Sequence, residues 1–225
     1  MSARILAPTI LALSTIGAAE ASPVLGMQFD VIENNLEQDA VTYRCLVTLE
    51  NGARIDSVFG NQDSLLRIAP RDGRSFYQNP LGGPTSQSIN TAFFPLIPSL
   101  EWDSFVTIGA LDTLGSPFSD NELIDLGIDW EHFEAGAELF TNDGLWFIPP
   151  SAPQGQEVNG AVLIGQLTVL GGTGHAWSDL DVMLNLQGTD ADGAPWQFLG
   201  LTWVPAPSVL PALAFLLVGH RRRYG

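Results

Sequence analysis

The chain contains no lysine, so all nine of its basic residues are arginine, and it has only one cysteine. A single thiol excludes an intramolecular disulfide, so ordinary packing must stabilise the fold. Cys45 alternates with Tyr43 and Val47 along an apolar stretch, and we therefore expect a buried, inert thiol. With only three histidines in the chain, a multi-histidine zinc site is not available.

Positive charge is absent from long stretches. Between Ser75 and Trp203, sixteen Asp and Glu residues occur without one arginine. Residues 22–203 carry five arginines and 24 carboxylates, a formal net charge of −19. Such a surface repels polyanions and argues against a nucleic-acid partner. Solubility is the simplest interpretation of this charge, and an affinity for divalent cations is the alternative.

The C-terminal residues 204–225 differ from the rest of the chain. They begin with Val204-Pro205-Ala206-Pro207-Ser208, continue as an apolar run over 209–219, and close with Arg221, Arg222 and Arg223 ahead of Tyr224-Gly225. The apolar run favours a membrane helix that starts after a break at the prolines. The triple arginine is expected on the cytoplasmic side, where it would act as a stop.

This order of proline motif, apolar segment and basic cluster resembles the PEP-CTERM sorting signal, which exosortase recognises in exported bacterial proteins. Ala206 stands where the family's motif usually has an acidic residue. The resemblance implies a protein that is transiently anchored in the inner membrane and then processed by exosortase. Its destination would be the cell surface or the exopolysaccharide-rich biofilm matrix. A plain transmembrane anchor that is never cut is the alternative.

The N-terminal residues 1–21 have the pattern of a secretory signal peptide. Arg4 precedes an apolar stretch over 5–18, and Ala19-Glu20-Ala21 comes before Ser22. A positive start, an apolar middle and a small-x-small site are typical of such peptides. We expect cleavage between Ala21 and Ser22, and the cellular export machinery is the partner that this segment implies.

Between these ends, residues 22–203 read as one acidic domain. Apolar and polar residues alternate over 41–50, 102–109 and 180–187, as in half-buried strands. Further strands are predicted at 27–32, 57–60, 65–68, 161–170 and 196–203, and a helical turn or two at 120–126. The predicted fold is all-β, an antiparallel β-sandwich of jelly-roll or immunoglobulin-like type. It would be flanked by the N-terminal signal peptide and the C-terminal membrane-sorting helix.

Two stretches of this domain, 76–83 and 98–109, are similar to a block found in uncharacterised exported proteins with the same kind of tail. Counted from 76 to 109 with the segment between the two stretches, the resemblance spans about thirty residues. It implies a shared fold and carries no established activity.

Asp190 and Asp192, just before Gly193, form the sharpest metal-binding pattern. Alternate carboxylates followed by glycine resemble the opening of a calcium loop. An Asp-Gly hairpin turn explains the same letters. Calcium is therefore the one cofactor that the sequence suggests, and Asp179 and Asp181 could contribute from a neighbouring loop.

The Gly-rich stretch 171–179 contains a candidate ligand-binding group, Trp177, His175 and Asp179. In a sugar site, the indole would stack on a ring while the imidazole and the carboxylate bond hydroxyl groups. A loop that only connects two strands is the alternative. The ligand implied by the first interpretation is extracellular polysaccharide.

No motif in the chain indicates catalysis. There is no Gly-x-Ser-x-Gly elbow, and no lysine follows the glycine-rich stretch to bind phosphate. The sequence therefore predicts a non-enzymatic, exported protein with a structural or adhesive role. A calcium- or glycan-binding extracellular module is the first alternative, and a secreted hydrolase is the second.

Overall fold

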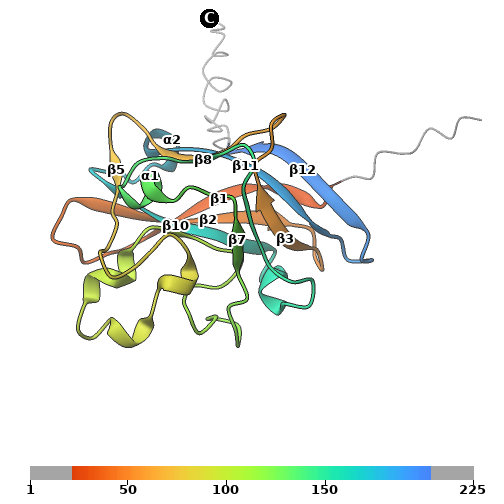
Figure 1. Cartoon of the computed structure of the whole chain (residues 1–225), viewed down its shortest axis with the longest axis horizontal. Helices are drawn as coiled ribbons and strands as arrows, with labels where there is room; N and C mark the ends of the chain where they lie inside the picture. Colours follow the sequence, from red (N-terminus) through yellow and green to blue (C-terminus); the bar gives the residue numbers. More distant parts are fainter. Residues whose placement is uncertain (1–21, 204–225) are drawn as a thin grey trace, which may run out of the picture.

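Two antiparallel β-sheets make up most of the structure, a computed structural model that describes residues 22–203 (Figure 1). The predicted signal peptide and the predicted sorting tail lie outside these residues. The prediction of an all-β fold is confirmed for the described part. Within residues 22–203, no helix has the length and apolar character needed to cross a membrane.

The first sheet is built on three long strands in the order β1, β2, β10. Two short strands, β5 and β6, both pair with β10, at different points along it. The bounds are β1 Val24–Ile32, β2 Ala40–Leu49, β5 Ser75–Phe76, β6 Phe105–Val106 and β10 Ala161–Leu170.

The second sheet is centred on β11, with β12 along one edge. The other edge of β11 is shared end to end by two strands, since β4 pairs with its first half and β3 with its second half. Beyond these lie β8 next to β4, then β9 next to β3, and finally β7. The bounds are β3 Arg54–Phe59, β4 Leu66–Pro70, β7 Ile124–Leu126, β8 Leu139–Thr141, β9 Leu145–Phe147, β11 Leu180–Thr189 and β12 Pro195–Thr202.

One hydrophobic core joins the two sheets. From β2, Val41 at the start of the strand is only half-buried, while Tyr43, Cys45, Val47 and Leu49 are buried as predicted. They share a cluster with Leu184 and Leu186 of β11, which belongs to the second sheet. Each such side chain contributes about 1.5–3 kcal/mol by leaving water, so this core takes the place of the missing disulfide.

Asn185 stabilises the point where β11 changes neighbour from β3 to β4. Its buried side-chain amide donates to the carbonyl oxygens of Phe59, Ser64 and Leu65, and its oxygen accepts from the Ser64 hydroxyl and the Gly200 amide. The polar groups left unpaired by the strand exchange are therefore satisfied by one side chain.

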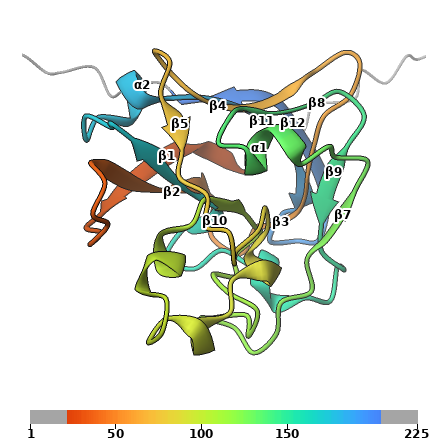
Figure 2. The same cartoon turned by 60° about the vertical axis from the view of Figure 1, so that its left-hand side comes forward.

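A lobe of short 3-10 turns covers the outer face of the first sheet and lies below the sheets in Figures 1 and 2. It has a small core of its own, formed by Ile89, Leu100 and Phe105. Gln166 of β10 donates to the carbonyl oxygens of Glu101 and Asp103, so β10 is buried on both faces. The turns are η1 Ser86–Ser88, η2 Thr91–Phe93 and η3 Pro98–Trp102.

Two predictions about local structure are wrong. Of the strand predicted at 102–109, only Phe105–Val106 forms, because η3 ends at Trp102 and the lobe buries both faces of the residues after it. Of the helical turn predicted at 120–126, residues 124–126 instead form β7, whose backbone pairs with β9, and residues 120–123 form no helix. The α-helical turns of the described residues are α1 Glu131–Glu134 and α2 Ala176–Asp179, and a further 3-10 turn is η4 Pro153–Gly155.

The two stretches of the resembling block meet at Asp103. Its buried carboxylate accepts hydrogen bonds from the backbone amides of Asn79, at 2.7 Å, and Gly83, at 3.1 Å. A side chain at Gly82 would displace this carboxylate, since its Cβ would lie 1.8 Å from Asp103 Oδ2. Burial raises the pKa of Asp103 to about 7, with a smaller contribution from the charge of Glu134.

Candidate functional site

The loop between β10 and β11, residues 171–179, lies next to the β4–β5 turn at one end of the sheets (Figure 2). The backbone joins the two segments, because the amide of Arg71 donates to the carbonyl oxygen of Asp179 at 2.8 Å. The predicted ligand-binding group falls in this loop, whose last four residues form α2.

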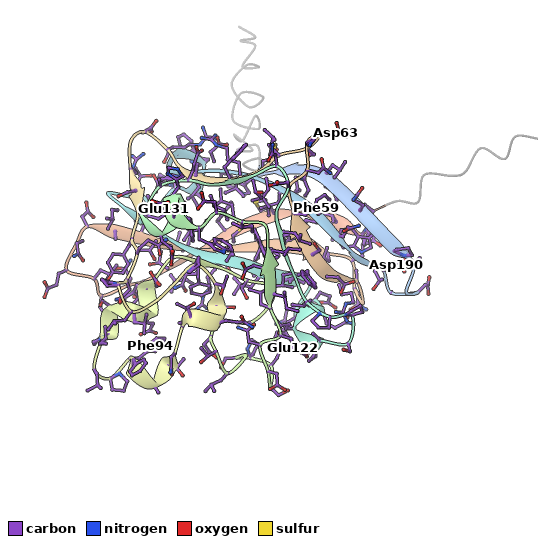
Figure 3. The ribbon with its side chains drawn as sticks, in the orientation of Figure 1. Phe59, Asp63, Phe94, Glu122, Glu131 and Asp190 are labelled. Carbon is purple, nitrogen blue, oxygen red and sulfur yellow. The ribbon has the colours of Figure 1, made fainter. Side chains whose placement is uncertain are left out.

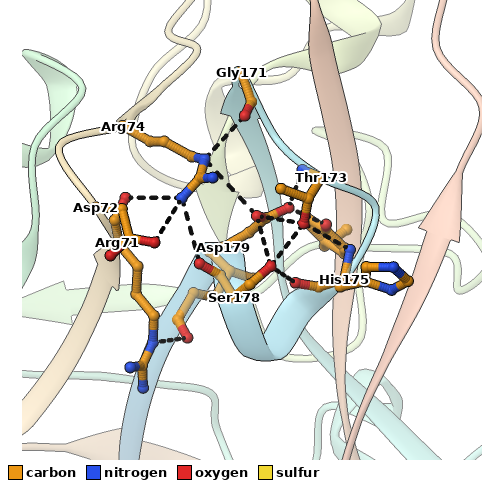
Figure 4. A network of polar contacts seen from close by, with 10 residues as sticks. Arg71, Asp72, Arg74, Gly171, Thr173, His175, Ser178 and Asp179 are labelled. Atoms are coloured by element: carbon orange, nitrogen blue, oxygen red, sulfur yellow. Dashed lines mark hydrogen bonds and ion pairs between the residues drawn. The ribbon is translucent and has the colours of Figure 1, made fainter.

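Asp179 lies in the interior and holds the loop together (Figure 4). Its carboxylate accepts from the Tyr43 hydroxyl, from the Thr173 amide at 2.6 Å and hydroxyl at 2.8 Å, and from the Ser178 hydroxyl at 3.1 Å. Burial raises the pKa of this carboxyl, but the hydrogen bonds outweigh burial and hold the pKa below its usual range. Asp179 is fully buried, so it does not face a ligand as the sequence interpretation requires.

Arg74 connects the β4–β5 turn to the same loop (Figure 4). Its Nε donates to the carbonyl oxygen of Gly171 at 2.9 Å and lies 3.8 Å from Asp179 Oδ1. Its terminal nitrogen lies 3.2 Å from a carboxylate oxygen of Asp72. The guanidinium therefore joins two segments far apart in the sequence and balances a buried charge.

The other two predicted residues lie together on the surface. The rings of His175 and Trp177 stack, with centroids 6.2 Å apart and planes inclined by 23°. Trp177 is 56% exposed, which is unusual for so large an apolar side chain. The two rings lie nearly parallel but well offset, so much of the indole is left for other contacts.

A cleft of about 400 Å³ opens beside Trp177, between the start of β11, the end of β12 and β1. Phe29 and Trp203 form part of its wall, in edge-to-face contact with centroids 5.7 Å apart. Sequence reasoning missed both residues, because no local pattern links them to the loop. The cleft is lined by Phe29, Arg71, Trp177, Leu180, Asp181, Val182, Thr202 and Trp203.

The polar part of the cleft wall is an arginine–aspartate group. Asp181 pairs with Arg67 and with Arg71, whose terminal nitrogen lies 3.3 Å from Asp181 Oδ1. Arg71 also donates from Nε to the carbonyl oxygen of Leu180 at 2.7 Å, which fixes its side chain at the cleft. The sequence does contain a clue to this group, since three of the five arginines in residues 22–203 fall between positions 67 and 74.

Asp190 and Asp192 lie in the hairpin turn that joins β11 to β12. The Asp190 carboxylate accepts from the amides of Asp192, at 3.0 Å, and Ala194, at 2.8 Å. Asp179 and Asp181 lie at the other end of the ten-residue strand β11, about 30 Å away at ~3.3 Å per residue, and cannot join the turn. Across residues 22–203, no cluster of three or more His, Cys, Asp and Glu side chains is placed to hold a metal.

Most of the other carboxylates lie on the surface, while Asp103 and Asp112 are buried. Asp63, Glu122, Glu131 and Asp190 lie at well-separated places around the domain (Figure 3). The cleft beside Trp177 brings together aromatic rings, a guanidinium and a carboxylate, a combination suited to holding a polar ring-shaped ligand. In comparisons with known proteins, the chain matches no family model, no curated protein and no solved structure.

Proposed function

We propose that this chain is an exported cell-surface or extracellular-matrix protein, processed by exosortase, with a structural or adhesive role that is not enzymatic. The observation that carries the proposal is the pair of addressing segments at opposite ends of the sequence. The first is the signal-peptide pattern of residues 1–21, and the second is the proline, apolar and arginine order of residues 204–225. Two independent patterns agree on one destination.

The domain between them suits this role. Its core is closed around a single buried cysteine, so its stability does not depend on the redox state of the compartment. Two antiparallel sheets that share one core support the inference of a β-sandwich, of jelly-roll or immunoglobulin-like type. Such folds serve widely as surface and adhesion modules.

The acidic surface fits a hydrated extracellular setting. Residues 22–203 carry a formal net charge of −19, which keeps copies apart and soluble at moderate salt. The same charge argues against nucleic acid as the adhesive partner. Neutral components of the matrix are the better expectation.

Mass spectrometry of both termini of the protein from its native cells tests the proposal. We expect a new N-terminus at Ser22 and a C-terminus at or after the motif Val204–Pro207, in material from the cell surface or medium. Replacing Arg221, Arg222 and Arg223 with alanine should leave more unprocessed protein. Intact chains from Met1 to Gly225 in the cytosol would refute the proposal, and an intact tail in the membrane would favour a permanent anchor.

A second candidate function, a ligand-binding extracellular module, is supported by the aromatic and polar cleft beside Trp177. The calcium-dependent form of this idea has weaker support, because the Asp190 carboxylate is engaged by its own turn. The glycan-binding form has the stronger support, because aromatic and polar side chains line the same cleft.

A further inference from the structure

We propose that the cleft between Trp177 and Trp203 binds a neutral sugar unit of an extracellular polysaccharide. The proposal rests on the proposed function, because an exported matrix protein meets such polymers. The site is formed by four segments of the chain. They contribute Phe29 from β1, Arg71 from the residues after β4, Trp177 and Asp181 from α2 and the start of β11, and Trp203 from the residue after β12. The buried Asp179 is not among them.

The aromatic groups provide the apolar part of the site. Trp177 is 56% exposed, and contact with the nearly parallel His175 ring helps to hold its indole in position. Phe29 packs edge to face on Trp203 at 5.7 Å and fixes that ring as well. The apolar face of a pyranose ring, with its C–H groups, suits rigid aromatic surfaces of this kind.

Arg71 and Asp181 provide the polar part. Nε of Arg71 is occupied by the carbonyl oxygen of Leu180, while its terminal nitrogens retain donors beyond the 3.3 Å contact with Asp181. The carboxylate of Asp181 has more acceptor sites than its two arginine partners fill. A sugar hydroxyl both donates and accepts, so it can bond to the two groups at once.

The charge of the domain selects among sugars. With a formal net charge of −19 over residues 22–203, the domain repels uronic-acid polymers as it repels nucleic acid. The charges of Arg67 and Arg71 are balanced by those of Asp181 and Glu138, so this group offers no net positive charge to offset the repulsion. Neutral hexoses are therefore the class that fits, and a cleft of about 400 Å³ lies in the usual range of ~300–1,000 Å³ for small-ligand sites.

The site is also formed before any ligand arrives. Asp179 ties the loop to Tyr43 of β2, and Arg74 ties the same loop to the β4–β5 turn. Trp177, two residues before Asp179, is thus carried on a fixed segment. Binding then requires little ordering of the protein, which favours affinity.

Calorimetry on the purified full-length chain tests the proposal. The chain is kept in a detergent without a sugar headgroup, and titrated with neutral gluco-, manno- and galacto-oligosaccharides and with an oligouronate of matched length. We expect one or more neutral oligosaccharides to bind better than the oligouronate. Trp177→Ala should weaken that binding at least tenfold, equal to about 1.4 kcal/mol, and Trp177→Phe should restore part of it.

Phe93→Ala is the matched control, since Phe93 is 46% exposed and lies in η2 of the lobe, away from the cleft. It should bind like the unmodified chain. The proposal is overturned if no neutral oligosaccharide binds, if the oligouronate binds best, or if Trp177→Ala binds unchanged. It is also overturned if Trp177→Ala turns a dimer into a monomer in sedimentation, because the occupant would then be a second copy.

The two proposals fail separately. A chain with processed termini outside the cell that binds no sugar overturns only the cleft assignment. An unprocessed cytosolic chain overturns the proposed function, whatever the calorimetry gives.

Discussion

The Tyr43 hydroxyl donates a hydrogen bond to the carboxylate of Asp179, across 136 positions of sequence. Tyr43 belongs to β2 of the first sheet and has no exposed surface, while Asp179 immediately precedes β11 of the second. Burial and the bond to Asp179 both raise the pKa of Tyr43 above its usual range, so the phenol remains a donor. One polar contact thus connects the common core to the loop that carries Trp177.

Tyr43→Phe removes this donor and little else. A hydrogen bond to a charged group contributes about 1.5–3 kcal/mol, so we expect the free energy of unfolding to fall by that amount in urea titrations. The bonds from Thr173 and Ser178 remain, and the fold should be retained. An unchanged free energy of unfolding would show that the contact does not stabilise the protein.

Asp179 and Asp103 should respond to pH in opposite directions. For Asp179, whose pKa is held below its usual range, stabilisation is present at neutral pH and is lost as the pH falls through the folded-state pKa. For Asp103, burial raises the pKa from 3.8 to about 7, so the folded protein binds this proton more tightly than the unfolded chain. Its contribution is therefore present below about pH 4 and is lost as the pH rises to about 7.

Asp103→Asn should remove the loss of stability that Asp103 causes as the pH rises from about 4 to about 7. About three pKa units correspond to an energy on the order of 4 kcal/mol between pH 4 and pH 8. We expect the free energy of unfolding of the variant to change less over this interval than that of the unmodified protein. If the free energy of unfolding changed with pH by the same amount in both proteins, Asp103 would not be the group responsible, whatever the difference between them at any single pH.

Asn185→Ala should be among the most destabilising single changes. It leaves three carbonyl oxygens without their donor and takes the acceptor from Ser64 and Gly200. We expect a loss of about 3 kcal/mol or more in the free energy of unfolding, because buried unpaired groups lose their full hydration. Ser64→Ala removes only one of these bonds and should cost about 1 kcal/mol. Equal effects of the two variants would argue against the role given to Asn185.

Millimolar calcium should shift the melting temperature by about a degree or less. Asp190 already stabilises its own turn, and the described residues place no group of three or more metal-binding side chains together. A tight site at 100 times its dissociation constant would add about 2.7 kcal/mol, a shift of several degrees. A shift of that size, lost in Asp192→Asn, would instead identify the turn as a calcium site.

The sequence predicted the long strands well because hydrophobic alternation is a local signal. The strand predicted at 161–170 coincides with β10, and the one predicted at 41–50 differs from β2 by one residue at each end. Cys45 is buried as expected, and burial raises the pKa of its thiol to about 12. Alternation failed at 102–109, where the lobe buries both faces and period two no longer separates inside from outside.

The candidate site was only half visible in the sequence. The loop 171–179 stood out through its glycines and its Trp–His pair, and the structure places that pair together. Phe29, Arg71 and Trp203 reach the cleft only through the pairing of β1 with β2 and of β4 and β12 with β11. Strand pairing at such sequence separation leaves no local pattern, so these residues could not be identified from the sequence.

Trp203 lines the cleft and is also the residue just ahead of Val204, where the proline motif begins. The residue proposed to bind a sugar and the motif proposed to be recognised by exosortase would therefore be adjacent along the backbone. If both proposals hold, a polymer bound at Trp203 would occupy the residue next to the motif that exosortase is proposed to recognise. Delivery would then be ordered in time, with scission first and engagement of the polymer afterwards.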